Sequence, residues 1–152
     1  MATATSGGIV FRKSVPQSMH GEFLGWLDEA LAWMRDKYPA TDFDRVRHYI
    51  FNRGGYRSRY YRKGRRGLEG PVVMIAWTEC MSLYVMRSLG ITAPKRLAVP
   101  GRVQVVSALI HELTHHHQHE HGLPRGEVLT TENELEWLQV AAPTVHQKFL
   151  SE

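Results

Sequence analysis

The stretch that decides the fold is R-V-Q-V-V-S-A-L-I-H-E-L-T-H-H-H-Q-H-E-H, residues 102–121. Its apolar residues recur at spacings of three and four, which is typical of a helix with one buried face. The residues expected on that face are Val103, Val106, Leu109, Ile110 and Leu113. His111 and His115 fall on the opposite side, about one turn apart. Gly122 follows the stretch, so the helix is expected to end there.

Upstream of this helix, the sequence predicts one further helix and a small sheet. Apolar residues at helical spacing run from Ser18 to Pro39. The expected strands are 8–11, 45–50, 56–61 and 71–77, and residues 80–89 fit either a helix or a strand. The stretch 71–77 is a continuous apolar run, so its strand is expected to be buried. A last helix is expected from Thr131 to Ala142. The fold class is therefore α+β, with an N-terminal helix and a small, mostly antiparallel sheet.

Length and composition indicate a single domain over residues 1–152, with residues 1–17 as a flexible arm. Cys80 is the only cysteine, which excludes an internal disulfide and favours a reducing compartment. No secretory signal and no apolar run of about 20 residues is present, so a cytoplasmic protein without a membrane partner is expected. The net charge of +4 suggests an anionic partner without identifying one.

The residues His111-Glu112-Leu113-Thr114-His115 form an H-E-x-x-H motif. Two histidines four residues apart on a helix can both reach one Zn²⁺ ion. The glutamate beside the first histidine can take a proton from a zinc-bound water, which makes Glu112 the candidate catalytic base. The motif therefore predicts zinc as cofactor, with His111 and His115 as metal ligands.

A catalytic zinc requires a third protein ligand, and the sequence offers several. His121 has the metzincin position, but residue 118 is Gln rather than the Gly that lets the chain turn. An acidic cluster on the next helix, residues 132–136, can supply a carboxylate instead. Glu132 and Glu134 are both candidates, and Thr131 and Glu134 also match a T-x-x-E capping box that would begin the helix.

Over residues 102–142 the chain resembles the gluzincin branch of the zincin metallopeptidases. That pattern pairs H-E-x-x-H with a glutamate ligand on a later helix, often followed four residues on by an acid that supports a histidine. The resemblance implies Glu132 as third ligand, Glu134 as the alternative, and Glu136 as the supporting acid. The family's usual aspartate is here Glu136, and its small preceding residue is Leu135. A zincin-like scaffold also implies an edge strand that binds extended peptide, and residues 71–77 are the candidate for a strand of that sheet.

The prediction is thus a zinc-dependent metallopeptidase acting on a peptide or protein substrate. One alternative is a zinc-containing binding or regulatory module without catalysis. Another is a nucleic-acid-associated protein that uses the basic and aromatic segment 53–66. The SprT-like zincins would be the precedent, but they carry a histidine where this chain has Glu120. We therefore favour a solvated basic face and commit no nucleic-acid-binding residue.

His116 is expected to pack through hydrogen bonds rather than take part in catalysis. The candidates for stabilising an oxyanion are left open among Tyr56, Tyr60, Tyr61 and His146.

Overall fold

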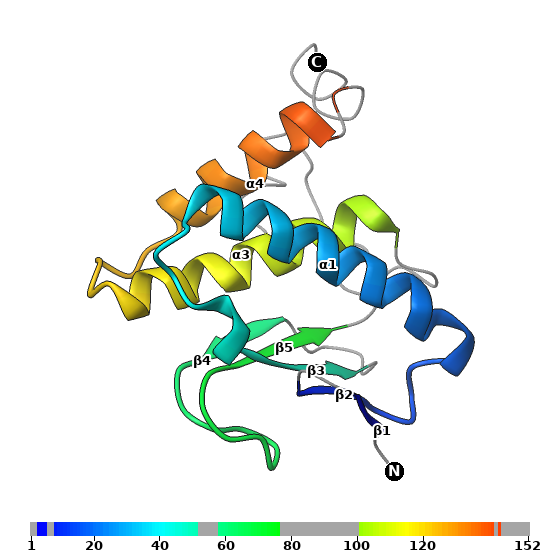
Figure 1. The fold of residues 1–152 in the computed structure, drawn as a ribbon. Coiled ribbons are helices and arrows are strands. Elements are labelled where there is room, and N and C mark those ends of the chain that lie inside the picture. The colour runs from blue at the N-terminus through cyan, green and yellow to red at the C-terminus, as the bar shows by residue number, and fades with distance from the viewer. Residues whose placement is uncertain (1–2, 6–7, 52–57, 77–100, 142, 144–152) are drawn as a thin grey trace.

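The structure is a computed structural model, which describes residues 3–5, 8–51, 58–76, 101–141 and 143 (Figure 1). It confirms the α+β class. The strands are β1 (Thr3–Thr5), β2 (Ile9–Phe11), β3 (Arg47–Phe51), β4 (Arg59–Tyr61) and β5 (Val72–Ala76). The helices are α1 (His20–Lys37), α3 (Arg102–Glu120) and α4 (Val128–Ala141), with short 3₁₀ helices at Gln17–Met19 and Phe43–Arg45.

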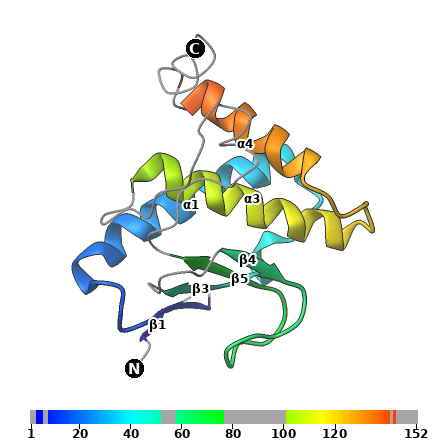
Figure 2. The same cartoon turned by 180° about the vertical axis from the view of Figure 1, so that it is seen from behind.

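The described elements stack in layers. Helices α1 and α3 lie side by side over one face of the sheet, and α4 packs on α3 on the side away from the sheet (Figures 1 and 2). The N-terminal helix was predicted, and it begins after the 3₁₀ turn that contains Ser18. Among the described residues, no helix combines the length and the apolar character that crossing a membrane requires.

The sheet is mixed, in the order β1-β2-β3-β5-β4. Strands β2, β3 and β5 are parallel to one another, whereas the β1–β2 and β4–β5 pairs are antiparallel. The expectation of a mostly antiparallel sheet is therefore wrong. The physical reason is the α1 crossover, which returns the chain to the end where β2 began and so makes β3 parallel to β2.

The core lies between the sheet and the helices. Side chains alternate along β3, so Ile50 faces the helices while Tyr49 and Phe51 join a smaller cluster on the other face. All five residues of β5 are buried, which confirms the expected buried strand within 71–77. The predicted apolar face of α3 is confirmed as well, since Leu109, Ile110 and Leu113 are fully buried. Each such side chain contributes roughly 1.5–3 kcal/mol.

The expected strand at 8–11 is confirmed as β2, but the stretch 1–17 around it is more than an arm, because it also supplies β1 and places Phe11 and Val15 in the core. The predicted start of the last helix is wrong. Helix α4 begins at Val128, before Thr131, whose N–H already donates to the Glu127 carbonyl at 3.0 Å. The predicted capping box at Thr131 therefore does not start this helix. Cys80, the ambiguous element 80–89 and Trp77 lie outside the described residues.

Candidate metal centre

Helix α3 presents the motif histidines on the face opposite its core residues. His111 and His115 lie one above the other, with ring centroids 5.0 Å apart. Glu112 is only 6 % exposed, and its Oε1 lies 3.9 Å from His111 Nε2. The α3 register therefore places two imidazoles and one buried carboxylate beside one another, as the sequence predicted.

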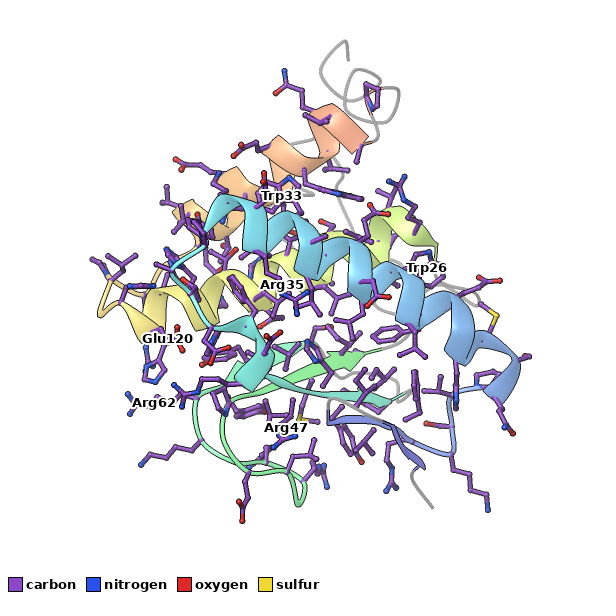
Figure 3. All side chains as sticks on the ribbon, in the orientation of Figure 1. Trp26, Trp33, Arg35, Arg47, Arg62 and Glu120 are labelled. Atoms are coloured by element: carbon purple, nitrogen blue, oxygen red, sulfur yellow. The ribbon has the colours of Figure 1, made fainter. Side chains whose placement is uncertain are left out.

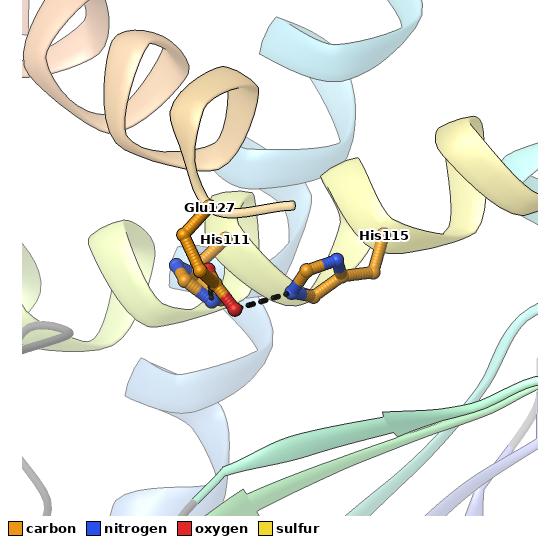
Figure 4. A group of neighbouring side chains, drawn as sticks. All are labelled: His111, His115 and Glu127. Atoms are coloured by element: carbon orange, nitrogen blue, oxygen red, sulfur yellow. Dashed lines mark ion pairs between the residues drawn. The ribbon is translucent and has the colours of Figure 1, made fainter. Parts of the chain in front are cut away.

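Glu127 is the residue immediately before α4, and its carboxylate contacts both histidines (Figure 4). Its Oε2 lies 2.9 Å from His111 Nε2, and its Oε1 lies 3.5 Å from His115 Nε2. One ligand atom from each of the three side chains falls within 4.8 Å of the others. Among the described residues, this is the group of histidines and acids whose atoms converge in the way a metal ion requires.

Two neighbours fix the position of Glu127. The Thr130 hydroxyl donates to Glu127 Oε2 and to the Glu127 carbonyl, both at 2.9 Å. Gln118, on α3, donates through Nε2 to the carbonyl of Gly126 at 3.3 Å and so ties the preceding residue to the motif helix. The carboxylate also sits at the positive end of the α4 dipole. The connection between α3 and α4 is thereby held with its acid turned toward the histidines.

Both histidines are oriented through Nδ1. His111 Nδ1 donates to Glu134 Oε2 at 2.9 Å, and the other oxygen of Glu134 accepts from Ser107 at 2.7 Å. His115 Nδ1 donates to Gln118 Oε1 at 2.9 Å. Because each Nδ1 is engaged as a donor, each Nε2 is the atom turned toward Glu127. Such outer contacts are typical of metal-binding histidines, whose ring orientation they set.

The pKa values of the two histidines shift in opposite directions. Burial lowers the pKa of His111, but hydrogen bonds to Glu127 and Glu134 overcome this effect and raise that pKa to about 10. The hydrogen bond to His111 in turn lowers the pKa of Glu127 to about 2. Burial and the neighbouring His111 lower the pKa of His115. The two carboxylates therefore stabilise a positive charge on the His111 ring, whereas the neighbouring His115 ring favours its neutral form.

The three acidic residues that the sequence suggested as ligand or support, Glu132, Glu134 and Glu136, have different surroundings in the structure. Glu132 is exposed and is not part of the converging group. Glu136 is also exposed and forms an ion pair with Lys37 of α1 rather than supporting a histidine. Glu134 is fully buried and supports His111, the part that the resemblance assigned to Glu136. The helix periodicity explains this, since residues 132 and 136 share the solvent face of α4.

Three further histidines on or just after α3, His116, His117 and His121, contact other partners. His116 is buried, donating from Nε2 to the Asp42 carbonyl and accepting at Nδ1 from the Tyr60 hydroxyl, both at 2.9 Å, which confirms its expected packing role. His117 and His121 share the Thr41 hydroxyl at 2.7 and 2.8 Å, so His121 does not join His111 and His115. Among the candidates for stabilising an oxyanion, Tyr56 and His146 lie outside the described residues.

Sequence reasoning missed Glu127 and Gln118. Glu127 was overlooked because the helix start was assigned to Thr131, which left Glu127 in a connection. A start at Val128 would have placed it at the helix N-terminus, where acids are favoured. Gln118 was noted only as the residue that breaks the metzincin pattern, whereas here it bridges His115 and the connection.

Comparison with protein-family models, with curated proteins and with solved structures gives no match for this chain.

Proposed function

We propose that the protein is a zinc-dependent metallopeptidase of zincin type, in which His111, His115 and Glu127 hold the metal. The observation that carries this proposal is the convergence of Glu127 with the two motif histidines within 4.8 Å. Two histidines and one glutamate are a known donor set for catalytic zinc, which leaves one position for water or substrate. The engaged Nδ1 atoms support the same assignment, because they leave Nε2 of each ring turned toward Glu127.

The chain's own residues divide the chemistry among them. Zinc, when bound, would lower the pKa of a water molecule and polarise the scissile carbonyl. Glu112 would accept the proton of the attacking water and return it to the leaving amine. Its burial shields the carboxylate from bulk solvent. Glu134 and Gln118 keep the two imidazoles in the orientation that presents Nε2.

The presence of a base distinguishes this proposal from a non-catalytic zinc module. A purely structural site needs ligands alone, whereas here a buried glutamate lies 3.9 Å from a ligand nitrogen. The edge strand β4 borders a cavity that reaches His115 and Glu127, so an extended peptide can lie beside the cluster.

The test compares the zinc-loaded parent with Glu112→Gln, which keeps the size of the side chain but cannot accept the proton. The variant is expected to bind zinc as the parent does and to lose peptidase activity by about 10²-fold or more. Chelation should abolish the parent's activity, and added zinc should restore it. A zinc-loaded parent that cleaves nothing in a broad peptide library would favour the binding module. Equal cleavage by both proteins would assign the base to another residue.

A further inference from the structure

A cavity of about 640 Å³ lies against the His111–His115–Glu127 cluster. It extends between the end of α3, the edge strand β4 with the loop that follows it, and the connection before α4. His115 and Glu127 form part of its wall, as do Tyr60 and Tyr61 of β4. A molecule held in this cavity therefore lies directly beside the proposed zinc ligands.

The cavity is lined by four cations, Arg62, Lys63, Arg65 and Arg125. All four are exposed, and Arg62 lies at the end of the molecule where α3 ends (Figure 3). Within the described part of the chain, none of them forms an ion pair, although Arg35, Lys37, Arg45 and Arg102 elsewhere all do. Glu127 is the one acid among the described lining residues, and it is engaged by the histidines. No ion pair between described residues thus neutralises the charge of this rim.

The loop that carries three of these cations is folded back on itself. Arg65 and Leu68 exchange backbone hydrogen bonds of 2.9 and 3.0 Å across a two-residue turn. Both turn residues, Arg66 and Gly67, have positive φ, of 54° and 78°, as a type I′ turn requires. The Arg65 guanidinium lies 4.8 Å from the centroid of the Tyr61 ring, a cation–π contact that keeps it near β4. The positive rim is therefore partly preorganised, which lowers the entropic cost of binding.

The edge strand favours a peptide over a nucleic acid as the occupant. Strand β4 is the last strand of the sheet and, among the described strands, pairs with β5 alone. Its outer backbone groups can take an added peptide strand, a contact that a nucleic acid does not provide. The cations also gather around one cavity instead of forming a long track along the surface.

We propose that this cavity selects peptide segments carrying Asp or Glu next to the scissile bond, an inference that rests on the proposed peptidase function. Unpaired cations attract carboxylates and exclude Lys and Arg side chains, which would place like charges together. The attraction acts between exposed groups, so salt screens it. Selectivity for acidic over isosteric amide peptides should consequently be large at low ionic strength and shrink as salt is added.

The experiment uses quenched fluorescent peptides in matched sets that differ only by Asp/Glu against Asn/Gln. With zinc-loaded parent, kcat/KM is expected to favour the acidic peptide by about 10-fold or more at about 20 mM salt and much less at about 0.5 M. Arg62→Glu combined with Arg65→Glu should abolish or invert this preference while zinc stays bound. Arg12→Glu combined with Lys13→Glu is the matched control, because both residues are exposed and neither lines the cavity. This control should keep the parental preference.

Binding measurements separate this inference from the peptidase proposal. Zinc-loaded Glu112→Gln is titrated, by fluorescence anisotropy, with the acidic peptide, the amide peptide and mixed-sequence single-stranded DNA. Tighter binding of the acidic peptide, lost in the Arg62/Arg65 variant, supports the inference even where the parent cleaves no peptide. Equal cleavage and binding of acidic and amide peptides overturn it while leaving the peptidase proposal intact. DNA that outcompetes the acidic peptide through the same two arginines also overturns it, in favour of a nucleic-acid ligand.

Discussion

The identity of the carboxylate ligand is the prediction that most directly tests the site. Three glutamates lie just before α4 or within its first two turns, namely Glu127, Glu132 and Glu134. The surroundings of their carboxylates differ. Glu127 converges with the histidines, Glu134 supports His111 from the buried side, and Glu132 faces solvent. Each Glu→Gln substitution removes one negative charge and keeps the size of the side chain. The three variants therefore form a matched series.

The expected losses of zinc affinity follow from these contacts. Zinc binding free energies of about 10–16 kcal/mol, spread over four ligands, give about 2.5–4 kcal/mol for each, or roughly 10²–10³-fold for Glu127→Gln. Glu134→Gln removes a supporting carboxylate behind a ligand, which costs about 10–100-fold. Glu132→Gln should leave the affinity at the parental value.

Competition with a chromophoric zinc chelator measures all three affinities at one pH, and circular dichroism checks that each variant is folded. The order of the losses, Glu127 then Glu134 then Glu132, is the outcome to look for. A folded Glu132→Gln protein that loses zinc as strongly as Glu127→Gln would refute the assignment of Glu127 as the metal ligand. It would restore the ligand that the gluzincin resemblance implies.

Two predictions concern the fold around the site. Burial, with a smaller contribution from His116, lowers the pKa of His48 to about 4, so the folded state disfavours the protonated ring. This contribution to the unfolding free energy is present above pH 6.5 and is lost as the pH falls toward 4. At pH 4.5 the unfolding free energy of the parent, measured by urea denaturation, should have dropped by about 2.5 kcal/mol more than that of His48→Leu. Asn133 of α4 is buried, and its amide donates to Tyr38, which follows α1, and to Thr114 of α3, both at 3.0 Å. Asn133→Ala should lower the unfolding free energy by about 1–3 kcal/mol with unchanged zinc affinity, and a loss of zinc affinity instead would assign Asn133 to the metal centre.

Periodicity predicted the parts of this molecule that depend on one element alone. The apolar face of α3 and the opposed histidines follow from a 3.6-residue repeat, so His111, His115 and Glu112 could be placed on one helix without a structure. The continuous apolar run of β5 likewise predicted a buried strand, and the structure buries all five of its residues. These features need no knowledge of what lies across the core.

Features that depend on two elements could not be predicted in the same way. The parallel pairing of β2 with β3 follows from the path of α1, which a local pattern does not contain. The third member of the cluster depends on how α4 crosses α3, and an error of three residues in the start of α4 was enough to hide Glu127. A capping motif at Thr131 matched the sequence rule, but burial of Glu134 against His111 and Ser107 decided its role.

Because α4 packs on α3, two acids contact the imidazole ring of His111 from opposite sides. Glu127 precedes the first turn of α4 and Glu134 lies about two turns later, and they contact Nε2 and Nδ1 of the same His111 ring. Trp137 and Leu138, both buried in the core, anchor the helix that carries these two acids. The position of His111 therefore depends on the docking of α4 as much as on α3. A metal held by His111 and Glu127 would bridge the two helices, so occupancy of the site and packing of α4 are linked by the same contacts.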